Sequence, residues 1–322
     1  MSAQLLIYIP FFKGLGFLKE AVESVRAQSN PNWALVVMDD CGPDGAAAQA
    51  WIESLSDHRI AYLRHPENKG MVANWNACLD HAAQRHTTFQ AQPQPPLVTL
   101  LHDDDRLLPH YVELMLAEHR SNPHAALYFC GAEIIDTQGR RIFSFPDYVK
   151  NFIAPPQSSY TLQGEVAFES LLAGCFIMCP TVSYNLHVLG SRRFTHGLKQ
   201  VQDLDFYLRI LDENLILQGT SAKAYAYRRH PTNATALQTQ SLLRFEEEAS
   251  LYDSWAERLA SKGFVRAATV ARKKRIIILN LLYCIVRDVL GFSFTSAQAK
   301  LKFLTRRVLN TRAALPMGST HT

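Results

Sequence analysis

The sequence predicts an α/β fold in which a Rossmann-like, mostly parallel sheet is flanked by helices and followed by a helical C-terminal extension. Three observations support this prediction. Short apolar runs alternate with segments of helical periodicity over the first 137 residues, as in βαβ units. Acidic or small residues follow several of these runs, at the edge where open α/β sheets bind ligands. Beyond residue 239 the periodicity is helical throughout.

The first part of the chain alternates between predicted strands and helices. Leu18, Ala21, Val22 and Val25, for example, recur at the spacing of one helix face. The predicted order is strand 5–9, a helix around 18–25, strand 34–38, helix 45–55, strand 60–63 and helix 71–83. This order predicts three βα units in one sheet.

A fourth strand is predicted at residues 97–101, after a proline-rich surface connection at residues 90–96. Pro109 is then expected in the first turn of a helix that runs to about residue 120, because helices tolerate proline there. A fifth strand at residues 126–130 leads to a predicted hairpin at residues 137–139.

The middle of the chain is less regular. The elements predicted there are a helix at 166–172, a strand-like run at 175–183, a helix at 203–211 and a last strand at 224–228. We therefore expect an α/β domain over residues 1–238 and a helical extension over residues 239–322.

The composition indicates an ordinary folded protein. Of the 322 residues, 48% are hydrophobic and 19% are charged. The net charge of +4 gives no reason to expect a nucleic-acid partner. The six cysteines show neither a CxxC pair nor zinc-type spacing, and the N-terminal residues do not resemble an export signal. These features favour a cytoplasmic protein.

Three consecutive carboxylates, Asp103, Asp104 and Asp105, follow the fourth predicted strand. Adjacent negative charges raise one another's pKa unless positive charge lies among them. A divalent cation with oxygen ligands supplies such a charge. For an isolated triplet the alternative is a solvated acidic loop that caps the next helix.

Six segments of the chain, taken in order, resemble the inverting nucleotide-sugar glycosyltransferases of family 2, which have the GT-A fold. The segments are IYIPFFKGLGFLKEAVESVRAQS, WALVVMDDCGPDG, NKGMVANWNACLD, LLHDDDRLLPHYV, QVQDLDFYLRIL and YRRHPTNAT. The resemblance implies an enzyme that moves a sugar from a nucleoside diphosphate sugar to a hydroxyl of a glycan or lipid-linked acceptor. It also implies Mn²⁺ or Mg²⁺ as cofactor. A Rossmann dehydrogenase is disfavoured because GxGxxG is absent.

The resemblance further implies a donor pocket built from strand ends. Pro10 is expected at the end of the first strand, and Asp39 or Asp40 is expected to hydrogen-bond the nucleobase or ribose of the donor. Asn68 and Gly70 should line the same pocket. The alternative for Asp40 is that its carboxylate only organises the turn that follows it.

By the same resemblance Asp104, the last acidic residue of the family's DxD signature, is the principal metal ligand. His102 stands where the first aspartate of that signature is usual. We assign Asp105 to the metal and Asp103 to the donor, although either of them could assist Asp104. His230 matches a histidine that in some relatives completes the metal or diphosphate site, and a loop histidine without a ligand is the alternative.

Asp203 matches the family's general base, which removes the proton of an acceptor hydroxyl as it attacks the anomeric carbon. Gln202 replaces a neighbouring acid that is usual in the family, so Asp203 is expected to be less basic than in relatives. Asp203 is also a candidate N-cap. Arg209 is expected to bind a donor phosphate or to form an ion pair, and Arg228 supplies positive charge near the expected diphosphate.

The segment at residues 276–292 is apolar but is shorter than the ~20 residues that span a bilayer, and Arg287 and Asp288 interrupt it. Basic clusters flank it on both sides. It could lie in the interface at the inner face of the cell membrane, or pack against the α/β domain or a subunit partner.

The altered positions at His102 and Gln202 leave one functional alternative, a nucleotide-sugar-binding protein of the same fold without transferase activity.

Overall fold

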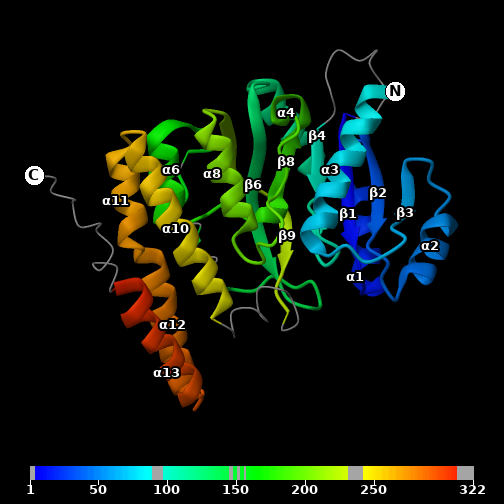
Figure 1. The fold of residues 1–322 in the computed structure, drawn as a ribbon. Helices are drawn as coiled ribbons and strands as arrows, with labels where there is room; N and C mark the ends of the chain where they lie inside the picture. Colours follow the sequence, from blue (N-terminus) through cyan, green and yellow to red (C-terminus); the bar gives the residue numbers. More distant parts are fainter. Residues whose placement is uncertain are drawn as a thin grey trace, which may run out of the picture.

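The computed structural model describes residues 4–88, 97–144, 148–150, 153–155, 157–230 and 242–309, with the backbone alone for residues 85–88. Figure 1 shows a central twisted sheet with helices on both faces and a group of helices, α10 to α13, beside one end of the sheet. The predicted mostly parallel α/β fold with a helical C-terminal region is confirmed.

The first half of the sheet follows the predicted βαβ order. Its elements are β1 (Leu5–Phe11), α1 (Leu15–Arg26), β2 (Trp33–Asp39), α2 (Gly45–Ser54), β3 (Ile60–Arg64), α3 (Met71–Thr88) and β4 (Leu97–Leu100). Strand β1 pairs in parallel with β2 and with β4, and β2 pairs in parallel with β3. The carboxyl ends of these strands therefore share one edge of the sheet.

The second half contains both parallel and antiparallel pairs. Its elements are β5 (Arg106–Leu107), α4 (Tyr111–Ser121), β6 (Ala125–Ile135), β7 (Ser159–Leu162), α6 (Gly164–Ala173), β8 (Val182–Asn185), α7 (Leu186–Leu189), α8 (Gln202–Asp212) and β9 (Ile216–Arg228). Strand β8 runs antiparallel between β4 and β6, whereas β6 and β9 are parallel. The path through the sheet is β3-β2-β1-β4-β8-β6-β9-β5, with β7 also paired to β9.

Apolar side chains cover both faces of the sheet, as expected for parallel strands that carry helices on each side. Along β1, Leu5, Ile7 and Ile9 point into one core, and Leu6 and Tyr8 point into the other. All five are at least nine-tenths buried. This double burial packs the strands on both faces up to the edge formed by their ends.

The C-terminal helices continue one of these cores. They are α10 (Leu243–Ser261), α11 (Val265–Lys273), α12 (Arg275–Leu290), α13 (Phe294–Phe303) and a π-helical turn (Leu304–Leu309). The ring of Phe168 in α6 lies 5.6 Å from that of Trp255 and 5.9 Å from that of Phe264. The described part of the predicted extension is thus helical and packs on the α/β part. The predicted boundary at residues 238 and 239 lies outside the described residues.

Several sequence predictions are wrong in detail. The run at 175–183 is not one strand, because a 3₁₀ turn (Cys179–Thr181) that contains Pro180 precedes β8. Pro109 lies before α4, whose N-cap is His110. Pro10 does not end β1, which continues to Phe11. Pairing with β4 stops at Tyr8, so the missing N–H of Pro10 breaks no bond to that strand.

The sequence predictions also concern the connection at 90–96 and a membrane-spanning helix, and they omit two short strands. The proline-rich connection at 90–96 lies outside the described residues. Among the residues described, no helix combines the length and the apolar character needed to cross a membrane. The short strands β5 and β7 were not predicted, because strands of two and four residues give little periodicity.

Phe12, the residue directly after β1, lies close to the turn after β2, and this contact generates a stability prediction. A Cβ on Gly42 would lie 1.5 Å from the carbonyl oxygen of Phe12. We expect Gly42→Ala to lower the free energy of unfolding by about 3 kcal/mol, because backbone must move to admit the methyl group. Urea denaturation measures this change.

The matched control is Gly16→Ala in α1, where an added Cβ meets no atom within 4 Å. That variant is expected to raise stability by about 0.5–1 kcal/mol, because alanine restricts the unfolded chain and favours the helix. Equal stability of the two variants would contradict the packing described for Gly42.

Candidate active site

The carboxylate of Asp39, at the end of β2, organises the turn that follows. Its Oδ1 accepts a hydrogen bond from the backbone N–H of Gly42 at 2.9 Å, and its Oδ2 accepts one from the hydroxyl of Tyr62 at 2.6 Å. Nε of Arg64 lies 3.4 Å from the same Oδ2. Asp39 is fully buried. The turn-organising role that the sequence suggested for Asp40 therefore belongs to Asp39.

Asp40 instead binds the loop before α3. Its carboxylate accepts hydrogen bonds from the side-chain amide of Asn68 at 3.1 Å and from the backbone N–H groups of Lys69 at 2.7 Å and Gly70 at 2.9 Å. Gly70 has φ of +85°, a conformation that favours glycine. The structure thus brings together Asp40, Asn68 and Gly70, which the sequence placed in one pocket, next to Asp39.

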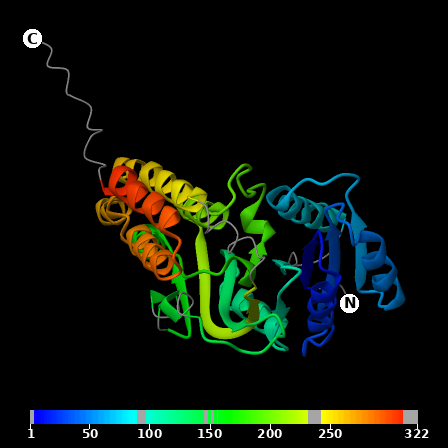
Figure 2. The ribbon, with the colours of Figure 1, turned by 90° about the horizontal axis from the view of Figure 1, so that it is seen from below.

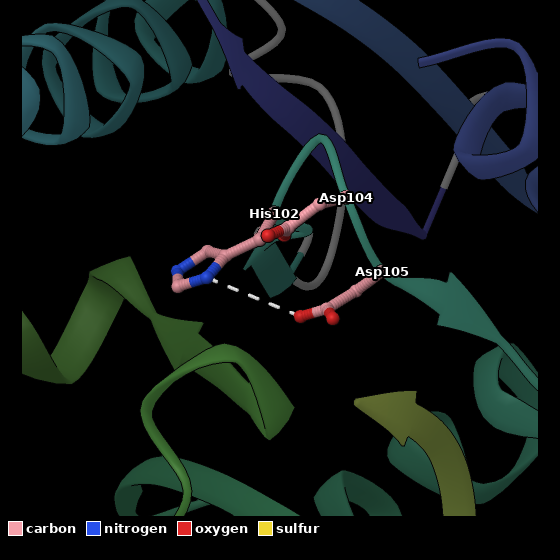
Figure 3. Close-up of side chains that lie close together, drawn as sticks. All are labelled: His102, Asp104 and Asp105. Carbon is pink, nitrogen blue, oxygen red and sulfur yellow. Dashed lines mark ion pairs between the residues drawn. The ribbon is translucent and has the colours of Figure 1, made fainter. Parts of the chain in front are cut away.

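The acidic triplet forms a turn after β4, and Figure 3 shows two of its carboxylates, Asp104 and Asp105, with His102. The backbone N–H of Asp105 donates to the carbonyl of His102 at 3.2 Å, which closes the turn. The carboxylate of Asp105 is fully buried. It accepts hydrogen bonds from the backbone N–H of Arg228 at 2.7 Å and the hydroxyl of Tyr225 at 2.9 Å. Asp105 therefore anchors the turn to β9, while its predicted metal contact stays a prediction.

Asp104 is the carboxylate of the triplet that is held ionised. Its Oδ2 lies 2.8 Å from Nε2 of His230. Burial alone would raise the pKa of Asp104, but the hydrogen bond from His230 and the nearby imidazoles of His102 and His230 lower it below its usual value. The structure thus joins two of the three residues predicted for the metal, Asp104 and His230.

The pKa of Asp103 is shifted in the opposite direction to that of Asp104. Burial and the charge of Asp104 raise the pKa of Asp103 to about 8, against a backbone hydrogen bond from Phe12. The pKa of Asp105 is also raised, first by burial and then by the charge of Asp104. A cation beside this turn would reverse both effects, because positive charge favours the ionised form.

The donor atoms of the turn fit a divalent cation. One ligand atom each from His102, Asp104 and Asp105 lies within 4.8 Å of the other two (Figure 3). Nδ1 of His102 is 4.0 Å from Oδ2 of Asp105. Carboxylate oxygens are the ligands that Mg²⁺ and Mn²⁺ prefer. Since both oxygens of Asp105 already accept hydrogen bonds, Asp104 is the more available of the two carboxylates.

Arg228 does not offer its charge to a diphosphate, contrary to the sequence interpretation. Its side chain is fully buried. It donates to the carbonyl oxygens of Asp104 at 2.6 Å and Thr137 at 2.9 Å and to Oε2 of Glu20 at 2.5 Å. The ring of Phe17 lies 4.6 Å from the guanidinium carbon. Arg228 is an internal support of the acidic turn.

Asp203 is the second residue of α8. The N-cap is Val201, so the predicted N-cap role of Asp203 is wrong. Its Oδ1 accepts a hydrogen bond from the backbone N–H of Leu204 at 2.8 Å. Burial raises the pKa of Asp203, against this bond and the charges of Lys150 and Arg244. Although Gln202 carries no charge, burial therefore makes Asp203 more basic than an ordinary aspartate.

A series of aromatic rings connects the acidic turn with α8. His102 stacks on Trp75 with a centroid separation of 5.3 Å, and Trp75 lies 5.3 Å from Phe194. Phe194 in turn lies 4.5 Å from Phe206 of α8. Asn76 fixes Phe194 by hydrogen bonds of 2.9 Å to its N–H and carbonyl. Sequence analysis missed Trp75 and Asn76, although both stand in the NKGMVANWNACLD segment.

Arg209 forms local contacts in α8. Its Nε lies 2.9 Å from Oδ2 of Asp205, and its Nη2 donates to the carbonyl oxygen of Arg193 at 2.8 Å. Asp205 also accepts a hydrogen bond from Thr195 at 2.7 Å. These contacts agree with the ion-pair alternative for Arg209, and its contact with a donor phosphate stays a prediction. Residues 231–235 of the last sequence segment lie outside the described residues.

The known proteins that resemble this chain are glycosyltransferases. The model of the family "Glycosyl transferase family 2" matches residues 6–166. The chain is 24% identical over 222 residues to a protein of *Escherichia coli* K12 named as a putative colanic acid biosynthesis glycosyl transferase, WcaA. That alignment spans 64% of this chain and 66% of the relative.

A second relative and a solved structure extend the comparison. The chain is 25% identical over 210 residues to the *E. coli* UDP-Glc:alpha-D-GlcNAc-diphosphoundecaprenol beta-1,3-glucosyltransferase WfgD, over 65% of this chain and 70% of the relative. The mannosyltransferase PcManGT of *Pyrobaculum calidifontis*, solved with GDP-Man and Mn²⁺, superposes with a TM-score of 0.55 at 14% identity. The superposition covers 97% of this chain and 88% of that protein, and it shows a shared GT-A fold.

The buried position of Arg228 generates a prediction. We expect Arg228→Lys to lower the free energy of unfolding by about 2–3 kcal/mol, because lysine keeps the charge but cannot bond several carbonyl oxygens in one plane. Urea denaturation at neutral pH measures the loss. The control is Arg229→Lys, at the next position of the chain. If Arg228→Lys left stability unchanged and weakened only nucleotide binding, Arg228 would face a ligand as the sequence suggested.

Proposed function

The chain belongs to glycosyl transferase family 2, and from this premise we propose a metal-dependent, inverting transfer of one sugar from a nucleoside diphosphate sugar to a hydroxyl group. The enzyme class itself is shown by the family match. The proposal adds the cation, the base and the acceptor. The observation that supports it most is the contact of the Asp104 carboxylate with His230, beside a cluster of candidate ligands.

The donor is proposed to lie along the edge formed by the ends of β1, β2 and β4. Asp39 and Asp40 with Asn68 and Gly70 would shape the nucleoside part of this site, and Pro10 and Asp103 would line it. Asp40 already binds the side-chain amide of Asn68 and the backbone N–H of Lys69. The loop is therefore preorganised before a donor binds. Arg209 is proposed to bind a phosphate of the donor.

The cation is proposed to be held first by Asp104, with Asp105 and His230 as supporting residues. When bound, Mn²⁺ or Mg²⁺ would offset the negative charge that develops on the leaving diphosphate. His230 keeps Asp104 deprotonated, which a metal ligand requires. Arg228 fixes the backbone of Asp104 and so orients its carboxylate.

Asp203 is proposed to take the proton of the acceptor hydroxyl as the oxygen attacks the anomeric carbon. Attack on the face opposite the leaving group inverts the anomeric configuration in a single displacement. Burial raises the pKa of Asp203, which brings it closer to the working range of a general base. The packed aromatic rings from His102 through Trp75 and Phe194 to Phe206 support the position of α8 beside the acidic turn.

The acceptor is proposed to be a lipid-linked or growing polysaccharide. The relatives support this class, since one is named for colanic acid biosynthesis and another for transfer to a sugar on diphosphoundecaprenol. Polysaccharide biosynthesis for the cell envelope is therefore the proposed role.

The role of Asp203 can be tested by Asp203→Asn. We expect turnover to fall by roughly 10²–10⁴-fold, because amide cannot accept the proton, while donor affinity stays unchanged. Sugar transfer with a panel of nucleotide sugars and titration with the free nucleoside diphosphates measure the two quantities. In the unmodified enzyme, kcat/KM should decline as the pH falls through the raised pKa of Asp203, because protonation removes the base.

Asp212→Asn is the matched control, since it makes the same change at the other end of α8, where Asp212 pairs with Arg258 and Lys262. Turnover of this variant should match that of the unmodified enzyme. Full transfer activity of Asp203→Asn would rule out Asp203 as the base. Donor binding without turnover in the unmodified enzyme would instead favour a binding protein.

The role of Asp104 can be tested by Asp104→Asn. We expect the affinity for Mn²⁺, in the presence of UDP or GDP, to fall at least about tenfold, because the ionised ligand is lost. Thermal shift with Mn²⁺ titration detects the change, since a bound ligand stabilises the folded protein. Asp80→Asn, on the exposed pair with Arg193, is the control. Unchanged Mn²⁺ affinity of Asp104→Asn would place the cation elsewhere.

A further inference from the structure

Helix α12 has an apolar face that the rest of the described structure leaves uncovered. Its other face packs inward through Ile277, Leu281, Cys284 and Asp288. The exposed apolar residues recur every three or four positions, which places them on one side of the helix. They are Leu279, Leu282, Tyr283, Val286, Val289 and Leu290.

The turn between α12 and α13 extends this apolar face. Phe292 is 82% exposed and Phe294 is 61% exposed, with their ring centroids 6.3 Å apart. Leu301 in α13 and Leu309 in the π-helical turn are also exposed. Several large apolar side chains exposed on neighbouring helices are typical of a binding surface. We call this group, from Leu279 to Leu309, the apolar surface.

The charge of the same helices is almost entirely positive. Residues 265–309 contain ten lysines and arginines but a single acidic residue, Asp288. Asp288 is buried, and its carboxylate lies 2.5 Å from Nζ of Lys300. The exposed basic residues are Arg266, Arg272, Lys273, Arg275, Arg287, Lys302, Arg306 and Arg307. Of these, Arg266 pairs with Glu165 and Glu169 of α6, and Arg307 pairs with Asp253 of α10. Exposed negative charge is thus absent from the described helices α11 to α13.

Buried ion pairs show which basic residues serve the fold instead. Lys300 pairs with Asp288, and Lys274 pairs with Asp253 of α10. Both lysines are nearly inaccessible to solvent. The exposed basic residues are therefore a separate set, and they lie in α11, α12, α13 and the π-helical turn, the same helical region as the apolar surface.

The position of these helices suits contact with a flat surface. Figure 1 shows α12 and α13 projecting beyond the body of the molecule, with their connecting turn on the side toward which β1, β4 and β9 run. Figure 2, seen from that side, shows the helices beside the sheet rather than across its edge.

We propose that the apolar surface of α12 and α13 binds the face of a lipid bilayer that contains anionic phospholipids. The apolar side chains enter the boundary between headgroups and acyl chains, and the exposed arginines and lysines contact lipid phosphates. At 16 residues α12 is shorter than a bilayer-spanning helix, so it lies in the interface. The inference is independent of the proposed donor, cation and base.

The test is flotation of the full chain with phosphatidylcholine vesicles, with and without phosphatidylglycerol. We expect binding only when phosphatidylglycerol is present, and weaker binding in high salt. The variant Arg272→Gln/Lys273→Gln/Arg275→Gln should weaken binding about 100-fold, at about fivefold for each removed charge. Leu282→Gln/Val286→Gln/Leu290→Gln should weaken it at least about tenfold, because the inserted side chains become polar.

Val166→Gln is the matched control, because Val166 is an exposed apolar residue of α6 outside the apolar surface. This variant should bind vesicles like the unmodified chain. Circular dichroism shows whether each variant is folded. Absent binding to phosphatidylglycerol vesicles, or binding unaffected by both triple variants, overturns the proposal. It is also overturned if light scattering without lipid shows a dimer that the leucine and valine variant converts to the 36.3 kDa monomer.

Discussion

The contact between the acidic turn and the end of β9 is the constraint on which the site depends. Asp105 accepts a hydrogen bond from the backbone of Arg228, Arg228 donates to the carbonyl of Asp104, and His230 bonds the carboxylate of Asp104. Three bonds thus join two residues, Arg228 at the end of β9 and His230 just beyond it, to two residues of the turn. Since Arg228 and Asp105 are fully buried, the loss of either partner would leave unpaired polar groups in the interior.

This contact gives the three adjacent aspartates different properties. Asp105 is buried with both oxygens occupied, burial shifts Asp103 toward its protonated form, and His230 keeps Asp104 ionised. Three identical side chains in a row therefore differ in protonation and hydrogen bonding because their partners differ. This difference favours Asp104 as the first ligand of a cation, and it explains why a carboxylate triplet is stable at the end of a buried strand.

Sequence patterns predicted the local parts of this structure well. The apolar runs and helical spacing located β1 to β4 and α1 to α3, and the motif order placed Asp40 with Asn68 and Gly70. The support by Arg228 was not predictable, because its partners Glu20 and Asp104 lie 208 and 124 positions away. Trp75 was missed for a similar reason, since only the fold brings it onto His102. The burial of Lys274 and Lys300 depends on helix packing, which charge patterning does not reveal.

The central claim is that Asp104, fixed by His230 and Arg228, is the carboxylate that holds a divalent cation beside the donor. Anomalous diffraction at the manganese edge, from crystals grown with Mn²⁺ and a nucleoside diphosphate, tests it most directly. The account predicts an anomalous peak at coordination distance from a carboxylate oxygen of Asp104, with the diphosphate bound to the same ion. A peak bound to other residues, with Asp104 still paired only to His230, would contradict it.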